Sequence, residues 1–134
     1  MLNVLCKTLF MRDKTLIIES LEQLEQVIES LLESTSNIQN IGELPKSADG
    51  ILRLNGICMY FIIIGEEVKR IDRYTEKQFL SNYSSIPWES VMGLRDRIAH
   101  GYFEIDIDVV FDALKNDIPP LLEVIKQMKN DLSQ

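Results

Sequence analysis

Residues 12–35, "RDKTLIIESLEQLEQVIESLLEST", decide the class of the fold. Apolar side chains recur at positions 16, 17, 21, 24, 27, 28, 31 and 32, and glutamates and glutamines occupy most positions between them. This three-and-four spacing predicts an amphipathic helix that buries one face. The pattern lasts for only about three heptads, so packing within a bundle is favoured over a coiled coil.

A second helix is expected from about residue 47 to residue 72. Its middle, "GICMYFIII" (56–64), is apolar on nearly every face. A helix that is apolar all round is normally surrounded by protein, so we expect this helix to be the central element. The stretch before it, "NIQNIGELPKSADG" (37–50), breaks the helical rhythm with Asn, Gly and Pro and is expected to form a loop.

Local capping and turn signals predict the remaining helices. No alternation typical of β-strands persists anywhere, so the expected class is an all-α, up-and-down bundle of about four main helices plus short ones. Thr75 and Gln78 form a capping-box pattern that would open one short helix, and Asp106 or Asp108 would cap another. A longer helix is expected to begin at Pro87 and to end at Gly101, and the last helix is expected to begin near Pro119.

The composition of the 134 residues is that of an ordinary globular domain, with 46% hydrophobic and 26% charged residues. We expect a single domain over residues 11–134 and a dispensable extension over residues 1–10, because the helical pattern begins only after Met11. The longest apolar run has about half the length that a bilayer requires, and the N-terminus lacks a signal-peptide layout. The expected location is therefore the cytoplasm.

Charge and cysteine content exclude several kinds of site. The net charge of −7 disfavours broad electrostatic binding to nucleic acid but leaves room for a local basic patch. Cys6 and Cys58 form neither a metal-binding spacing nor a disulfide framework, and Cys58 is expected to be a buried thiol. No P-loop, dinucleotide fingerprint or nucleophile elbow occurs, so no cofactor is expected.

The stretch "RDRIAHGY" (95–102) holds the only histidine of the chain. One interpretation is structural: a histidine near a helix C-terminus interacts favourably with the helix dipole, and the arginines are solvated. The other is functional. Arg95 and His100 are about 7.5 Å apart along a helix axis, so their side chains can converge on one bound group, flanked by Arg97 and Tyr102. Arginine can hold two phosphate oxygens and histidine can move a proton, which suits phosphoryl chemistry. With one histidine and no cysteine nearby, no metal site is expected.

Arg95, His100 and Tyr102 form an R-x4-H-x-Y pattern that resembles the signature of HepT-like proteins. These are the toxin halves of bacterial HepT–MntA toxin–antitoxin pairs, in the HEPN superfamily of helical domains. The resemblance extends over most of the chain from Met11. Asp96 fits the polar residue that usually follows the motif arginine. The blocks that carry the resemblance are "MRDKTLIIESLEQLEQVIES", "IGEEVKRID", "YSSIPWESVMGLRDRIAHGYFEIDIDVVFDAL" and "PPLLEVI".

The resemblance implies a HEPN-like bundle and a metal-independent endoribonuclease that works as a homodimer. Arg95 would bind the scissile phosphate, and His100 would act as general acid or base. Asp96, Arg97 and Glu66 are the expected supporting residues. The resemblance also implies a type VII-like toxin–antitoxin pair, with an MntA-like nucleotidyltransferase antitoxin that transfers AMP to Tyr102. RNA would be the substrate, and no membrane partner is expected.

Two questions stay open at the level of sequence. Glu66 or Glu67 could orient Arg95 from the central helix, with Glu66 favoured because it follows Gly65 and a buried run. Alternatively, the two glutamates form a solvated pair with Lys69 or Arg70. The protein could also be a non-catalytic helical module that binds a nucleotide or a partner enzyme, and the acidic net charge mildly favours this.

Overall fold

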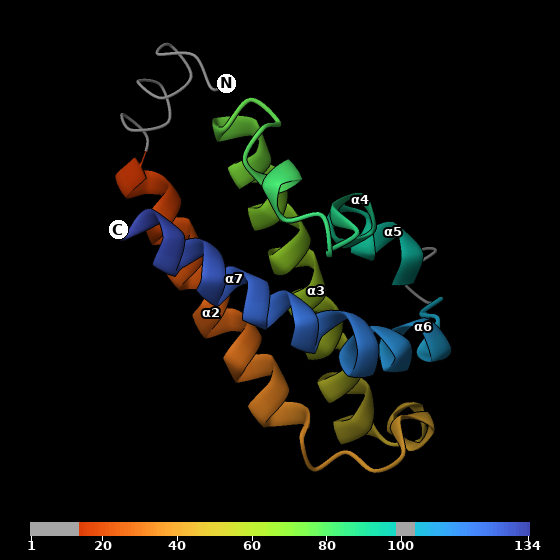
Figure 1. The fold of residues 1–134 in the computed structure, drawn as a ribbon. Helices are drawn as coiled ribbons and strands as arrows, with labels where there is room; N and C mark the ends of the chain where they lie inside the picture. The colour runs from red at the N-terminus through yellow and green to blue at the C-terminus, as the bar shows by residue number, and fades with distance from the viewer. Residues whose placement is uncertain (1–13, 99–103) are drawn as a thin grey trace.

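The computed structural model describes residues 14–98 and 104–134, and these residues form helices and turns with no β-sheet (Figure 1). The predicted all-α class is therefore confirmed. Three long helices dominate: α2 (Lys14–Thr35), α3 (Ala48–Tyr74) and α7 (Ile118–Leu132). The short elements are α4 (Trp88–Met92), α5 (Leu94–Ile98), α6 (Ile107–Asp112), the 3-10 turns Ile41–Lys46 and Leu80–Asn82, and the π turn Ala113–Asp117.

Helix α2 packs against both α3 and α7, and all three long helices contribute to one core (Figure 1). Its buried positions repeat at the predicted three-and-four spacing. The side chain of Lys129 on α7 donates a hydrogen bond to Glu25, and Lys126 lies 3.7 Å from Glu29, so two ion pairs join the rims of these helices. The buried side chains of α2 are Ile17, Ser20, Leu21, Leu24, Ile28 and Leu31.

Helix α3 begins as predicted and is two residues longer at its C-terminal end. The hydroxyl of Ser47 accepts a hydrogen bond from the backbone N–H of Gly50 at 3.0 Å, which caps the helix. The expectation that protein surrounds α3 is wrong for one face, because Leu52, Met59 and Ile63 are 72%, 56% and 42% exposed. Periodicity could not reveal this face, since α3 is apolar on both its covered and its uncovered sides. By length and composition alone α3 could cross a membrane, although the central helix of a soluble bundle has the same properties.

The predicted helix from Thr75 does not form. Thr75 is instead the C-cap of α3, and its hydroxyl donates to the carbonyl of Ile71 at 2.9 Å. Glu76 and Lys77 then adopt left-handed backbone conformations, with φ of 55° and 63°. These conformations stop helical growth, so the segment contributes only the 3-10 turn Leu80–Asn82.

The segment after Pro87 also differs from the expected single helix. It forms α4 and α5, which are separated at Gly93, where φ is −95° and ψ is 11°. Glycine has the lowest helix propensity after proline, which favours a break at this point. The end of the predicted helix, at Gly101, lies outside the described residues.

Asp106 is the cap of α6, as predicted, and accepts a hydrogen bond from the N–H of Val109 at 3.2 Å. The two helices expected after it are joined by the π turn into one helical run. Pro119 and Pro120 cannot donate backbone hydrogen bonds to the preceding turn. A locally widened turn accommodates this loss.

Candidate functional site

Close backbone packing sets the position of α4, and through it the position of α5. A Cβ atom on Gly65 of α3 would lie 3.1 Å from the carbonyl oxygen of Val91 and 3.3 Å from that of Met92. A larger residue at position 65 would therefore push α4 away from α3. Leu94 and Ile98, each 1% exposed, bury the inner side of α5. Together these contacts fix the direction in which the rest of α5 points.

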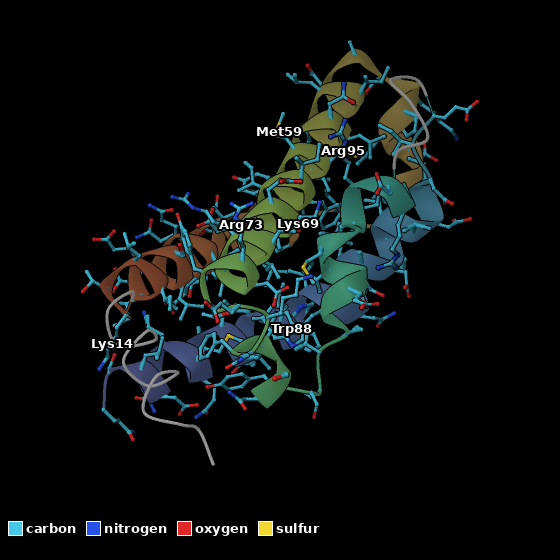
Figure 2. All side chains as sticks on the ribbon, turned by 90° about the horizontal axis from the view of Figure 1, so that it is seen from above. Lys14, Met59, Lys69, Arg73, Trp88 and Arg95 are labelled. Carbon is cyan, nitrogen blue, oxygen red and sulfur yellow. The ribbon has the colours of Figure 1, made fainter. Side chains whose placement is uncertain are left out.

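Arg95 lies on the outer side of α5 and is exposed. Its side chain forms no hydrogen bond or ion pair with any other residue in the described ranges 14–98 and 104–134. Figure 2 shows Arg95 and Met59 on the same side of the bundle, away from α7, and α5 is in contact with α3. Among the described residues the guanidinium has no partner that would prevent it from binding an anionic ligand.

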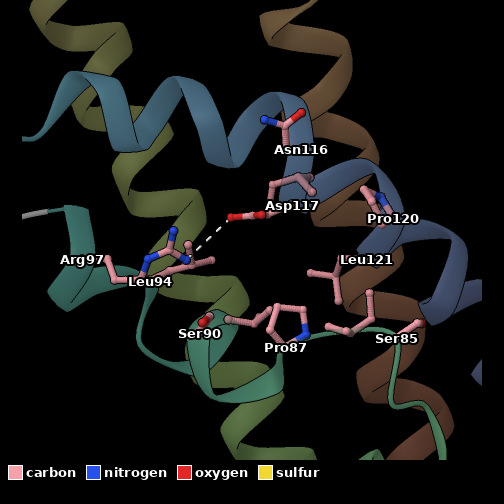
Figure 3. A pocket seen from close by; sticks show the side chains of 12 residues that line it. Ser85, Pro87, Ser90, Leu94, Arg97, Asn116, Asp117, Pro120 and Leu121 are labelled. Atoms are coloured by element: carbon pink, nitrogen blue, oxygen red, sulfur yellow. Dashed lines mark ion pairs between the residues drawn. The ribbon is translucent and has the colours of Figure 1, made fainter.

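Arg97 points in a different direction, because two residues along a helix correspond to a rotation of about 200°. Its Nη1 lies 3.6 Å from Oδ2 of Asp117, at the start of α7. The two side chains line a cavity of about 180 Å³ between α4, α5 and α7 (Figure 3). The structure thus brings Arg97 to Asp117 and does not bring it to Arg95. Asp96 is exposed between the two arginines.

Glu66 pairs with Lys69, with 3.2 Å between the carboxylate and the ammonium group, and both side chains are about half exposed. Within one chain Glu66 therefore forms the solvated pair with Lys69 that was one of the two interpretations. A contact through which Glu66 orients Arg95 remains a prediction. The position after Gly65 favours Glu66 over Glu67, yet the side chain of Glu67 is only 17% exposed. One carboxylate oxygen lies 3.8 Å from Arg70. The other is buried and has no hydrogen-bond partner among the described residues.

Glu67 lines a cavity of about 230 Å³ between α2 and α3, together with Gln23, Gln26 and Ile63. The sequence could have placed Glu67 near α2, because residue 67 follows Ile63 by one helical turn and both lie on the edge of α3 that faces α2. The burial of a carboxylate could not be inferred from that signal alone, since it depends on where α2 lies.

His100 and Tyr102 lie outside the described residues, so their expected convergence with Arg95 remains a prediction. Within residues 14–98 and 104–134, no group of three or more His, Cys, Asp or Glu side chains could hold a metal ion. Cys58 is half-buried rather than fully buried, and burial raises the pKa of its thiol.

Comparison with known proteins adds an independent finding. Residues 7–128 match the model of a family described as "Ribonuclease HepT-like". The chain is 32% identical over 66 residues to a "Putative RNase" of Caldanaerobacter subterraneus subsp. tengcongensis, a match that covers 49% of this chain and 55% of that protein. It is 37% identical over 59 residues to the "Probable ribonuclease HepT" of Thermococcus cleftensis, covering 44% of this chain and 50% of the relative.

A third relative, a "Putative RNase" of Methanocaldococcus jannaschii, is 26% identical over 98 residues, which cover 72% of this chain and 87% of that protein. The chain spans about half the length of the first curated relatives that it matches. No solved structure matches the chain.

Proposed function

Because the chain belongs to the HepT-like ribonuclease family, we propose that it is an endoribonuclease that cuts RNA without a metal ion, with Arg95 and His100 as its catalytic residues. The observation that carries the proposal is the exposed guanidinium of Arg95, which pairs with no residue in the ranges 14–98 and 104–134. Most of the other described arginines are engaged by neighbouring side chains: Arg53 by Asn37, Arg70 by Tyr74, and Arg97 by Asp117. As far as the described part of the chain goes, Arg95 is therefore open to an anionic ligand on a protein whose net charge is −7.

The proposed reaction is a transesterification at a phosphodiester. Arg95 holds two non-bridging oxygens of the scissile phosphate through its planar guanidinium. The ribose 2′-oxygen forms a bond to phosphorus while the bond from phosphorus to the 5′-oxygen breaks. One imidazole removes the proton of the 2′-hydroxyl, and a second imidazole protonates the departing 5′-oxygen. The products are a 2′,3′-cyclic phosphate and a 5′-hydroxyl.

The need for two imidazoles supports a homodimer, because each chain has one histidine. A two-fold axis would bring residues 95–102 of both copies into one cleft. The two Arg95 side chains would then form a local basic patch in an acidic protein. Asp96, exposed next to Arg95, and Glu66 on α3 are the proposed supporting residues.

The proposed role is that of the toxin in a type VII-like pair, acting on cytoplasmic RNA. An MntA-like nucleotidyltransferase would join AMP to the hydroxyl of Tyr102, with pyrophosphate leaving from ATP. The transferred group adds a negative phosphodiester and a bulky nucleoside close to Arg95 in sequence. Since Arg97 is engaged by Asp117, we expect the new charge to compete with RNA mainly for Arg95.

A cleavage assay with purified protein tests the proposed function directly. Wild-type protein should produce fragments that end in cyclic phosphate, and His100→Ala should not. Intact RNA after incubation with the wild-type dimer would instead favour the second candidate, a non-catalytic module that binds a nucleotide or the partner enzyme. The net charge of −7 is the observation that favours this alternative.

A further inference from the structure

The cavity between α4, α5 and α7 combines two charged side chains with an apolar floor. Arg97 and Asp117 line it, and the buried side chains of Val91, Leu94 and Leu121 contribute its apolar part. Figure 3 shows the guanidinium and the carboxylate pointing toward each other. The cavity volume is about 180 Å³. A drug-sized ligand needs about 300–1,000 Å³ and one water molecule about 30 Å³, so the cavity has room for one flat ring system.

The contact between the two charged groups leaves their hydrogen-bonding capacity open. Nη1 of Arg97 lies 3.6 Å from Oδ2 of Asp117, which is longer than a hydrogen bond from an N–H group to an oxygen. Neither side chain forms a hydrogen bond with any residue in the ranges 14–98 and 104–134. The side chains are 37% and 28% exposed, so a ligand in the cavity can reach both. The cavity therefore presents donors directly beside acceptors.

This arrangement restricts the class of ligand. An anion such as phosphate that bound Arg97 would lie next to the carboxylate of Asp117, and a cation that bound Asp117 would lie next to the guanidinium, so both are disfavoured. A neutral ligand with acceptors and donors side by side satisfies both groups. Nucleobases have such edges, and their flat faces pack well on apolar side chains.

We propose that this cavity binds a guanine base, supplied by RNA. One edge of guanine presents, in order, the O6 acceptor, the N1–H donor and the N2 amino donor. A guanidinium can donate to O6 while the two oxygens of one carboxylate accept from N1–H and from the N2 amino group. Arg97 and Asp117 are close enough to make these contacts together, because O6 and N1–H are neighbours on the base. Adenine and cytosine each offer the carboxylate only one donor, and uracil would place its O2 against it.

The cavity and the proposed phosphate contact lie on different sides of α5. Arg97 is two residues from Arg95, which corresponds to about 200° around the helix. The bound guanine therefore belongs to a nucleotide that is not adjacent to the cut. The inference rests on the proposed function for RNA as the source of the base, whereas the cavity itself does not depend on catalysis. Its effect falls on affinity, because neither Arg97 nor Asp117 takes part in the proposed reaction.

Nucleoside titrations test the cavity without RNA. Trp88 is the only tryptophan and follows Pro87, which lines the cavity, so its fluorescence can report binding beside calorimetry. Guanosine should bind at least about 10-fold more tightly than inosine, which differs only in lacking the N2 amino group. Adenosine should also bind more weakly. Equal affinities for guanosine and inosine would overturn the proposal, as would tighter binding of free leucine, a zwitterion that also complements both charges.

Asp117→Asn is the nearly isosteric variant that tests the carboxylate. Its amide keeps one acceptor and replaces the other with a donor, so guanosine should lose its advantage over inosine while the circular dichroism stays unchanged. Asp108→Asn is the matched control, since Asp108 is exposed on α6 and does not line the cavity. The control should bind guanosine as wild type does. An Asp117→Asn protein that keeps the full preference for guanosine would show that the carboxylate does not read the base.

Cleavage of matched RNAs tests the source of the base. The two RNAs differ only by guanine-to-adenine replacements outside the cleaved step. Wild-type protein should have a higher KM and the same kcat for the RNA without these guanines, and Asp117→Asn should not distinguish the two. Equal KM values together with guanosine binding would overturn RNA as the source and assign the cavity to a free guanine nucleoside.

Failure of this inference and failure of the proposed function give different results. Protein that cuts RNA but binds guanosine no better than inosine would reject the guanine site and leave the ribonuclease. Protein that prefers guanosine but leaves RNA intact would keep the guanine site and reject the ribonuclease.

Discussion

Arg97 lies 3.6 Å from Asp117 on the side of α5 that faces α7, whereas Arg95, two residues earlier, forms no contact of this kind with a described residue. The two arginines of the motif helix therefore have different surroundings. One is engaged by a carboxylate within the chain, and the other is available to a ligand. Variants at the two positions should therefore have different effects.

Arg95→Lys should lower the rate of RNA cleavage by about 10²–10³-fold, as the loss of a preorganised donor to a developing anion typically does. Lysine keeps the positive charge but cannot donate two parallel hydrogen bonds to a phosphate, as the planar guanidinium can. Because Arg95 is exposed, the free energy of unfolding should change by less than about 0.5 kcal/mol. Cleavage rates and urea denaturation measure the two effects, and a variant as active as wild type would exclude the proposed phosphate contact.

Arg97→Gln should keep most of the cleavage activity and lower the free energy of unfolding by at most about 1 kcal/mol, the usual range for a partly exposed ion pair. Asp117→Asn should have an effect of the same size. If the pair acts as a unit, the double variant should be little less stable than either single one. Loss of cleavage as severe as that in Arg95→Lys would show that Arg97 also serves the reaction.

His100→Ala should lower cleavage by about 10²–10⁴-fold, the usual contribution of general acid–base catalysis. Far-ultraviolet circular dichroism and thermal unfolding provide the control for folding. Wild-type cleavage should survive EDTA, since the proposed reaction uses imidazoles rather than a metal-bound hydroxide. Activity that disappears with EDTA and returns with magnesium would contradict the mechanism.

Co-expression with an MntA-like nucleotidyltransferase should add one or more AMP groups to the chain and lower its cleavage activity. Tandem mass spectrometry should locate an AMP group on Tyr102, and Tyr102→Phe should escape neutralisation while retaining its fold. A neutralised protein without AMP on Tyr102 would favour masking by a bound partner.

Tyr83 predicts a pH dependence of stability that is unrelated to catalysis. Its hydroxyl donates to Oδ2 of Asp131 at 2.6 Å, and burial together with this carboxylate raises the pKa of the phenol. The unfolded chain therefore loses the phenol proton at lower pH than the folded chain. The stabilisation is present below about pH 10 and declines as the pH rises further.

The matched variant for this prediction is Tyr83→Phe. It should lower the free energy of unfolding by about 1 kcal/mol at neutral pH, and the difference from wild type should shrink above about pH 10. Asp131 keeps a hydrogen bond from Gln127 at 2.7 Å in either case, so the variant isolates the phenol. A difference that is constant from pH 7 to pH 11 would show that the phenol proton is not linked to folding.

Local chemistry was predictable from the sequence where neighbouring residues determine it. Asp106, one of two predicted caps, caps α6 because its side chain reaches the backbone N–H three residues later. The predicted start of α3 near residue 47 is confirmed, and there Ser47 caps the helix in the same way. Thr75 was misleading, because its hydroxyl donates backward to the carbonyl of Ile71 at the end of α3 and does not cap a new helix. Which of the two occurs depends on the left-handed turn that follows, and propensity does not reveal that turn.

The relationships that define the site depend on distant parts of the chain. Asp117 reaches Arg97 only because α7 starts beside α5, and Glu67 is buried only because α2 covers it. The motif nevertheless identified the exposed arginine, since buried Leu94 and Ile98 on either side of it leave residue 95 facing outward. The exposure of a single residue such as Arg95 was thus predictable from its own helix, whereas a contact between distant segments was not.

The π turn at Ala113–Asp117 determines which side chains of α7 face the core. A π turn holds one residue more than the α-helical ladder would, and each residue of a helix advances the direction of the side chains by about 100°. Deleting one residue there would restore a regular helix and rotate every later position by that angle relative to α6. Ile125 and Met128 would turn out of the core, and Asp117 would turn away from Arg97. A one-residue insertion or deletion in this turn is therefore expected to disrupt the core, even where it changes no buried side chain directly.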